Sequence, residues 1–99
     1  MNKAKIQEII YNAIVMTNNI REENNQIPLL ETAELYGANG HLDSMGLVVL
    51  LIDIEESLLD EDLQVTLSDE RAMSQSKSPF RNVQALVDYI DALLKEVVL

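Results

Sequence analysis

The sequence contains no cysteine. Disulfides, cysteine-based zinc sites and catalysis by a thiol of the chain itself are therefore excluded. No apolar run is long enough to cross a bilayer, because the longest unbroken run extends only from Leu47 to Ile52. A secretory signal is also missing, since Asn12 interrupts the apolar stretch after the first lysines and no small-residue cleavage site follows. We therefore expect a cytoplasmic protein without a membrane span.

Basic residues are missing from the middle of the chain. The stretch from Glu22 to Glu70 holds 13 of the 17 acidic residues and no lysine or arginine, and the net charge is −10. Such a stretch should repel phosphate backbones, so we expect no nucleic-acid partner. It should attract proteins with basic patches and speed their encounter. Composition alone leaves open the alternative that the acidity only keeps the protein in solution.

Length and hydrophobicity limit the size of the fold. With 99 residues, of which 47% are hydrophobic, the chain can form one small domain with a core of its own. A wholly disordered chain is not expected, because disordered chains are poor in apolar side chains. The sequence has no internal repeat and no low-complexity tract, so we expect residues 1–99 to form a single domain.

Apolar residues at steps of three and four predict three substantial helices. The first extends from about Lys3 to Arg21, and the second from Ser44 to about Leu59, with Asp43 or Ser44 as its N-cap. The run Leu47–Ile52 leaves a buried strand as an alternative, although the acidic helix formers that follow favour a helix. The last helix follows Asn82 as its cap and is the clearest of the three.

The segments between these helices are less regular. Proline and glycine predict a long loop from about Gln26 to Asp43, which apolar residues should attach to the core; these are Leu29, Leu30, Leu35, Tyr36 and Leu42. Alternation over 63–67 indicates a short extended segment, Ser68 can cap a brief third helix, and 74–78 is expected to be loop. The predicted fold is all-α: a small four-helix bundle, with a short third helix and a long loop between helices one and two.

Ser44 stands between the predicted loop and the start of the second helix. A hydroxyl at this point would be exposed and held in place, so another enzyme could reach it. The partial positive charge of a helix N-terminus also suits an attached phosphate. The alternative is that Ser44 only caps the helix, which is common for a serine at this position.

Several motifs around Ser44 resemble those of acyl carrier proteins, the family of phosphopantetheine-dependent carriers. Asp43-Ser44-Met45 is similar to the Asp-Ser-Leu signature of that family, and the Gly-containing segment 36–42 is similar to the loop before it. Further similar segments extend over nearly the whole chain, from Ile6 to Val97; they are Ile54-Glu55-Glu56, 65–70, 78–83 and Asp88-Tyr89-Ile90.

The resemblance implies a function without catalysis by the chain itself. A phosphopantetheinyl transferase would attach 4'-phosphopantetheine from coenzyme A to Ser44, with Asp43 beside the attachment point. The thiol of the arm would hold acyl groups as thioesters and present them to synthase or acyl-transfer enzymes with basic patches, in fatty acid, polyketide or lipid metabolism. A chain without cysteine has no other thiol for this purpose. We expect a stand-alone, monomeric carrier.

The same resemblance indicates the second helix as the partner-binding face. The predicted partner-binding residues are Met45, Leu47, Val49, Glu55 and Glu56. Glu55 and Glu56 match acidic positions of the family. Gly46, Leu47 and Val49 depart from it, because the family often has an acidic, a polar and an acidic residue there. This departure predicts specialised partners or an interface with more apolar contact.

Two other functions remain as alternatives. The first is an unmodified helical interaction module that binds a partner helix through its apolar second helix. The second is a small serine-dependent enzyme using Ser44 and His41, which the missing Gly-x-Ser-x-Gly motif disfavours. No metal site is expected, because the acidic residues near Asp60 lack the spacing of a calcium loop. Met16, Met45 and Met73 are interpreted as core or near-core filler.

Overall fold

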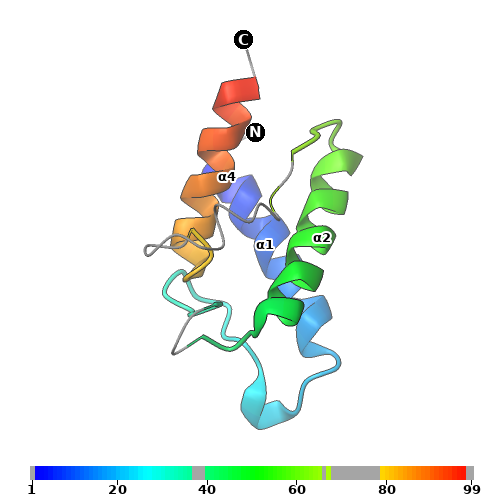
Figure 1. Cartoon of the computed structure of the whole chain (residues 1–99), viewed down its shortest axis with the longest axis vertical. Coiled ribbons are helices and arrows are strands. Elements are labelled where there is room, and N and C mark those ends of the chain that lie inside the picture. Colours follow the sequence, from blue (N-terminus) through cyan, green and yellow to red (C-terminus); the bar gives the residue numbers. More distant parts are fainter. Residues whose placement is uncertain (1, 37–39, 66, 68–78, 98–99) are drawn as a thin grey trace.

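The computed structural model describes residues 2–36, 40–65, 67 and 79–97, and in this part of the chain it is all-helical. Three α-helices are present, α1 (Lys3–Asn18), α2 (Ser44–Asp60) and α4 (Val83–Val97), together with a 3-10 helix, η1 (Glu23–Asn25) (Figure 1). Among these residues no strand forms, and only two isolated β-bridges occur. The predicted all-α class is therefore confirmed, and the alternative of a strand over 47–52 is wrong.

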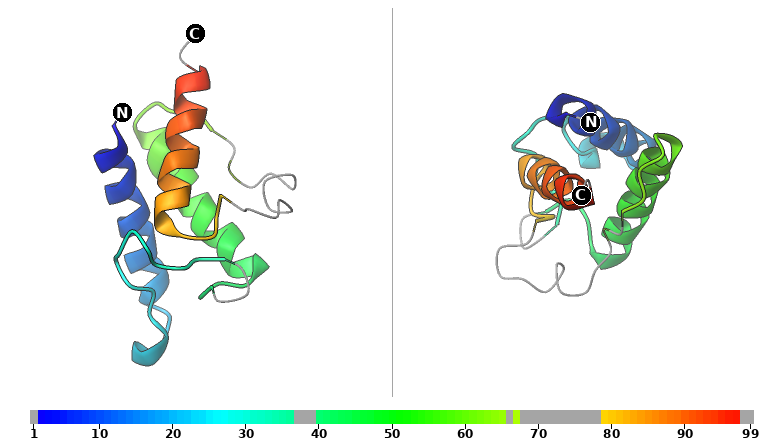
Figure 2. Two further views of the ribbon diagram at one scale, coloured as in Figure 1. Left: turned by 90° about the vertical axis from the view of Figure 1, so that its left-hand side faces the viewer. Right: turned by 90° about the horizontal axis from the view of Figure 1, so that it is seen from above.

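Helix α1 is the element against which the other two helices pack. It contacts both α2 and α4, and the view from above shows the three helices around a common centre (Figure 2). Its N-cap is Asn2, whose Oδ1 accepts a hydrogen bond from the Lys5 amide at 2.9 Å. Five residues at alternating steps of three and one face the core, as the periodicity predicted; they are Ile6, Ile9, Ile10, Ala13 and Ile14.

Helix α1 ends three residues earlier than predicted. Asn18 ties the end of the helix to the following loop. Its side-chain amide donates to the Ile27 carbonyl at 3.0 Å and accepts from the Ile27 amide at 2.8 Å. This pair of bonds brings the buried Ile27 back under the helix. Ile20 falls within the predicted range of this helix, but it lies beyond the end of α1 and is almost fully exposed.

Helix α4 follows the predicted pattern. The Asn82 side chain accepts from the Ala85 amide at 2.7 Å, as expected of its cap. Phe80, just before this cap, is fully buried and meets Tyr89 edge to face at 5.8 Å between ring centroids. The apolar face of α4 completes the core; its buried members are Val83, Ala85, Leu86, Val87, Ile90 and Leu94.

The chain before α2 is fastened to the start of α4. The Leu35 amide donates to the Arg81 carbonyl at 3.0 Å, and the Tyr36 amide donates to the Phe80 carbonyl at 3.1 Å. Leu35 and Leu42 are buried, so these two predicted anchors are confirmed. The same prediction was wrong for Leu29 and Leu30. Both are exposed, because the buried Ile27 and Ala33 fill the core positions on either side of them.

Three parts of the predicted fold stay predictions. The short third helix and the loop over 74–78 lie outside the described residues, so the four-helix bundle is not shown, and the expected long loop is likewise left open. Over 63–67 the described residues form no strand; Leu67 is buried while Leu63 and Val65 are partly buried against the core.

Candidate functional site

The start of α2 is built around a capping aspartate. Asp43 has an extended backbone, and its Oδ1 accepts a hydrogen bond from the Gly46 amide at 2.7 Å. Its carbonyl also accepts from the Leu47 amide at 2.9 Å, which begins the helical ladder. Asp43 therefore takes the N-cap, and Ser44 is the first residue of the helix. The side chain of Ser44 is outside the described part of the structure, whereas Asp43 and Met45 on either side are exposed.

Gly46 has a packing reason to be glycine. A Cβ atom placed on it would lie 3.2 Å from the capping Oδ1 of Asp43 and 3.2 Å from Cδ2 of Leu42. A larger residue at position 46 would therefore require the Asp43 or Leu42 side chain to shift by a few tenths of an ångström.

The chain segment before Ser44 is held in place by hydrogen bonds to backbone carbonyls. The Nδ1–H of His41 donates to the Glu34 carbonyl at 2.7 Å, and its amide donates to the same carbonyl at 3.3 Å. Arg21 donates from Nη2 to the His41 carbonyl at 3.1 Å and from Nε to the Asn25 carbonyl at 2.6 Å. His41 and Arg21 therefore fix the segment three residues ahead of the serine to the end of α1.

Gly40 allows the segment before Ser44 to pack closely against the backbone of Leu35 and Tyr36. A Cβ atom on Gly40 would lie 2.6 Å from the Leu35 carbonyl oxygen and 2.8 Å from the Tyr36 carbonyl carbon, which is too close for any other residue. The Leu42 amide can then donate to the Leu35 carbonyl at 2.8 Å. The glycine thus allows two stretches of backbone to meet just before the serine.

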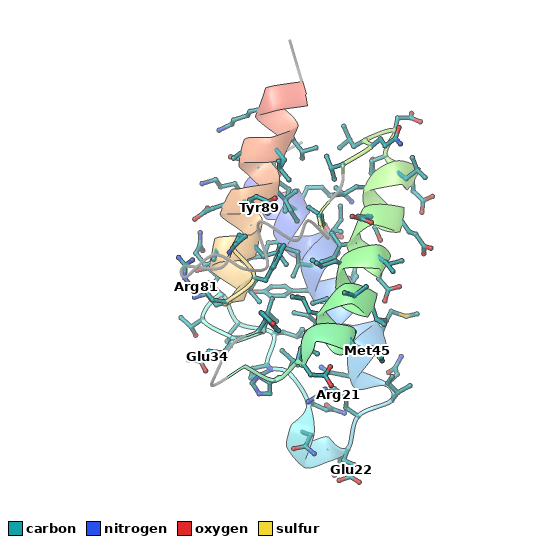
Figure 3. All side chains as sticks on the ribbon, in the orientation of Figure 1. Arg21, Glu22, Glu34, Met45, Arg81 and Tyr89 are labelled. Carbon is teal, nitrogen blue, oxygen red and sulfur yellow. The ribbon has the colours of Figure 1, made fainter. Side chains whose placement is uncertain are left out.

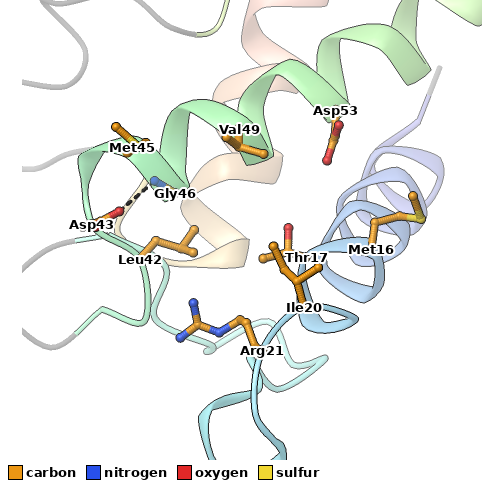
Figure 4. A pocket seen from close by; sticks show the side chains of 10 residues that line it. All are labelled: Met16, Thr17, Ile20, Arg21, Leu42, Asp43, Met45, Gly46, Val49 and Asp53. Atoms are coloured by element: carbon orange, nitrogen blue, oxygen red, sulfur yellow. Dashed lines mark hydrogen bonds between the residues drawn. The ribbon is translucent and has the colours of Figure 1, made fainter.

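A hollow of about 430 Å³ opens beside the serine, between the end of α1 and the start of α2 (Figure 4). Most of its lining is apolar; the lining residues are Met16, Thr17, Ile20, Arg21, Leu42, Asp43, Met45, Gly46, Val49 and Asp53. Sequence reasoning missed this hollow, because its two walls come from segments more than twenty residues apart. In the side-chain view, Arg21 lies beneath the start of α2 and Met45 lies on the first turn (Figure 3).

The predicted partner-binding residues do not share one environment. Met45, Val49 and Glu56 are exposed, which a contact surface requires. Leu47 is fully buried in the core, so its prediction as a surface residue is wrong. Glu55 is partly buried, and its Oε1 accepts a hydrogen bond from the Leu67 amide at 2.6 Å. Glu55 therefore has a structural task that the sequence did not indicate.

The exposed side of α2 carries a stripe of large apolar side chains. Its members recur at helical spacing and are Met45, Val49, Ile52 and Leu59. Met16 of α1 is exposed as well, so the interpretation of Met16 and Met45 as core filler is wrong. Both residues line the hollow instead.

Other kinds of site are not supported in the described residues. No group of three or more histidine, cysteine, aspartate and glutamate side chains there is arranged to hold a metal ion. None of the described helices is both long and apolar enough to span a bilayer. Comparisons of the chain with protein-family models, curated proteins and solved structures gave no match.

Proposed function

We propose that the protein is an acyl carrier that is modified with 4'-phosphopantetheine on Ser44. The observation that carries this proposal is the position of Ser44 as the first residue of α2, directly after a separate capping residue. Asp43 makes the cap bond, so the serine is not needed as the cap. Its neighbours in sequence are exposed, and the segment before it is fastened to the core.

The residues around Ser44 fit a phosphate diester. The first turn of α2 directs unpaired backbone amides toward the helix start, and the helix dipole adds partial positive charge there. Arg21 supplies a full positive charge in the same hollow, and its bonds within the described part of the chain go to neutral carbonyls. The negative charge of Asp43 acts against this positive charge, and one oxygen of its carboxylate accepts a hydrogen bond from the Gly46 amide. When attached, the arm supplies the thiol that carries acyl groups as thioesters.

The attachment step uses the serine hydroxyl as a nucleophile. A bond forms between Oγ of Ser44 and the phosphorus next to the pantetheine part of coenzyme A, while the bond from that phosphorus to the bridging diphosphate oxygen breaks. Adenosine 3',5'-bisphosphate leaves, and a base of the transferase takes the serine proton. The protein itself contributes the serine hydroxyl and an accessible surface, which is why we propose no catalysis of its own.

The acidic, apolar outer face of α2 supports docking of basic partner enzymes. Glu56 is exposed and Asp53 is partly exposed, and both stand beside the apolar stripe of α2. A partner with lysine or arginine around an apolar patch would complement this surface. We propose a transferase and acyl-handling synthases of this type as partners of a monomeric, cytoplasmic carrier. The expected pathway is fatty acid, polyketide or lipid synthesis.

The proposal is tested by incubating the full chain with coenzyme A, Mg²⁺ and a broad-specificity phosphopantetheinyl transferase. The intact mass should rise by one phosphopantetheine group in the wild type and in Ser57→Ala, and it should stay unchanged in Ser44→Ala. Ser57 is a suitable control because it lies on the same helix and its hydroxyl donates to the Asp53 carbonyl. An unmodified wild type, under conditions that convert a control carrier, would refute the proposal.

An unmodified interaction module is the second candidate. The exposed apolar stripe on α2 favours it, because large apolar patches on a protein surface commonly mark binding sites. This candidate predicts that Ser44→Ala retains full function in the cell, whereas Val49→Asp abolishes it. A carrier would lose function in Ser44→Ala.

A further inference from the structure

Two leucines between η1 and α2 face solvent on a segment that is held at both ends. Leu29 is 46% exposed and Leu30 is 58% exposed. Before them, Ile27 makes two hydrogen bonds to the end of α1. After them, the Ala33 carbonyl accepts from the first amide of α4 at 3.1 Å. A leucine pair on such a fixed segment loses little freedom when a partner contacts it, which favours binding.

A groove of about 270 Å³ lies beside this leucine pair, between α1 and α4. It is lined by Lys3, Ala4, Gln7, Glu31, Gln84 and Val87. Glu31 directly follows Leu30, and its carbonyl accepts from the Gln84 amide at 3.0 Å. The leucine pair and the groove therefore adjoin, and we call them together the α1–α4 surface. The volume is below that of small-molecule sites, which span about 300–1,000 Å³, and suits a single side chain.

The groove holds one negative charge that no described cation pairs with. Lys3 forms an ion pair with Asp88 at 3.0 Å, so its charge is compensated. Within the described part of the chain, the Glu31 carboxylate accepts only from the neutral side-chain amide of Gln7, at 3.0 Å. Gln7 and Gln84 both donate through Nε2, which leaves their carbonyl oxygens as acceptors. The groove thus offers a carboxylate and amide oxygens to a cation with several N–H donors.

We propose that the α1–α4 surface docks a protein segment that inserts an arginine into the groove and places an apolar side chain against Leu29 and Leu30. A guanidinium carries a positive charge and five N–H donors in one plane, which match a carboxylate with amide oxygens nearby. The net charge of −10 would also attract a basic segment before contact is made.

The α1–α4 surface lies away from α2. Both views of Figure 2 show the cyan segment after η1 running along α1 and α4, with α2 on the opposite side. The residues that line the groove come from α1, α4 and this segment. The inference therefore does not rest on the carrier proposal. A partner bound here would leave the start of α2 accessible, so one chain could be anchored and acted on by an enzyme at the same time.

A second copy of the chain is a poorer occupant of this surface. Each copy carries a net charge of −10, so two copies repel each other. Arg21 of each copy also already donates to two backbone carbonyls of its own chain. A basic segment of another protein avoids both costs.

The arginine site is tested on the full ¹⁵N-labelled chain with N-acetyl-arginine amide as the probe. The side-chain amide signals of Gln7 and Gln84, assigned from Gln7→Asn and Gln84→Asn, should shift as the probe is added. The citrulline amide, a neutral probe of similar shape, should bind about fivefold more weakly because its hydrogen bonds are not charge-assisted. Glu31→Gln should abolish this preference. Glu34→Gln should retain it, because Glu34 is an exposed glutamate of the same segment outside the groove.

The leucine pair is tested by comparing acetyl-Leu-Arg-Leu-amide with acetyl-Ser-Arg-Ser-amide. The leucine peptide should bind about fivefold more tightly, as expected from covering part of one exposed leucine. Leu30→Ser should remove most of this gain. Leu59→Ser should keep it, because Leu59 is also 58% exposed but belongs to α2.

The results that would overturn the proposal are distinct. Unchanged Gln7 and Gln84 signals, or equal binding of the arginine and citrulline amides, would exclude the arginine site. Equal binding of the two peptides would exclude the leucine pair. Signals that shift with protein concentration, without any probe, would show that a second copy covers the surface instead. None of these measurements requires modification of Ser44, so this inference and the carrier proposal can fail separately.

Discussion

Helix α2 has two apolar faces, and only one of them is covered. The inner face is fully buried against α1 and the rest of the core; it consists of Leu47, Leu50, Leu51, Ile54 and Leu58. The outer face presents Met45, Val49, Ile52 and Leu59 to solvent. The inner face stabilises the fold, and the outer face is free to contact partners. Apolar character alone therefore does not distinguish a core residue from a functional one in this helix.

The largest expected contrast is between two neighbours on these faces. Leu51→Ala should reduce the free energy of unfolding by about 2–5 kcal/mol, because it leaves a cavity in the core. Ile52→Ala removes an exposed side chain and should change it by less than about 1 kcal/mol. Urea unfolding of both variants measures the difference. Equal losses would show that the outer face is also buried in solution.

A second contrast separates two adjacent glutamates on α2. Glu55→Ala should cost about 1.5–2 kcal/mol, because the partly buried Leu67 amide loses its charged acceptor. Glu56→Ala should leave stability nearly unchanged, since Glu56 is exposed. Thermal unfolding checks this pair. If Glu56 proved the more important of the two for stability, the structural role assigned to Glu55 would be wrong.

The cap of α2 gives a smaller effect. Asp43→Ala should destabilise the protein by about 1 kcal/mol, through loss of the bond to the Gly46 amide. Asp53→Ala is the matched control, because Asp53 also lines the hollow but caps no helix. Chemical unfolding should rank Asp43→Ala as the less stable variant. The reverse order would contradict the assigned cap.

The smallest effect concerns an exposed ion pair between the N-terminal end of α1 and α4. Lys3 donates to Asp88 at 3.0 Å; this bond holds the pKa of Asp88 below its ordinary value and the pKa of Lys3 above its own. The folded state thus binds the Asp88 proton less tightly than the unfolded state does. The stabilisation by Asp88 is complete above the ordinary aspartate range, and it is lost as pH falls through the lowered pKa.

Lys3→Gln tests this pair through its pH dependence. The variant should be slightly less stable than the wild type near neutral pH, and the gap should close in acid once Asp88 is protonated. It should also close in strong base, as pH rises through the raised pKa of Lys3. Unfolding curves over this pH range provide the measurement. A gap that widened in acid would contradict the pairing.

The sequence predicted an element best where its apolar residues form a single stripe. Helix α4 has a single apolar stripe and an asparagine cap, and both were predicted correctly. Helix α2 carries apolar residues on two faces, so periodicity could not separate the buried Leu47 from the exposed Val49. The start of α2 was predicted because Asp43 is a strong capping residue close in sequence to its partner Gly46.

The hollow could not be predicted, because it depends on tertiary packing. Ile20 and Val49 are far apart in sequence, and they line one hollow only once α1 has packed against α2. The early end of α1 was also hidden, since it depends on the two bonds between Asn18 and Ile27.

The most direct test of the account is to locate the added group in the modified wild-type chain. After treatment with coenzyme A and the transferase, the protein is digested and its fragments are sequenced by mass spectrometry. The account predicts that one phosphopantetheine group is present and that every fragment carrying it includes Ser44. A group found on a fragment without Ser44, or no group at all, would contradict the central claim.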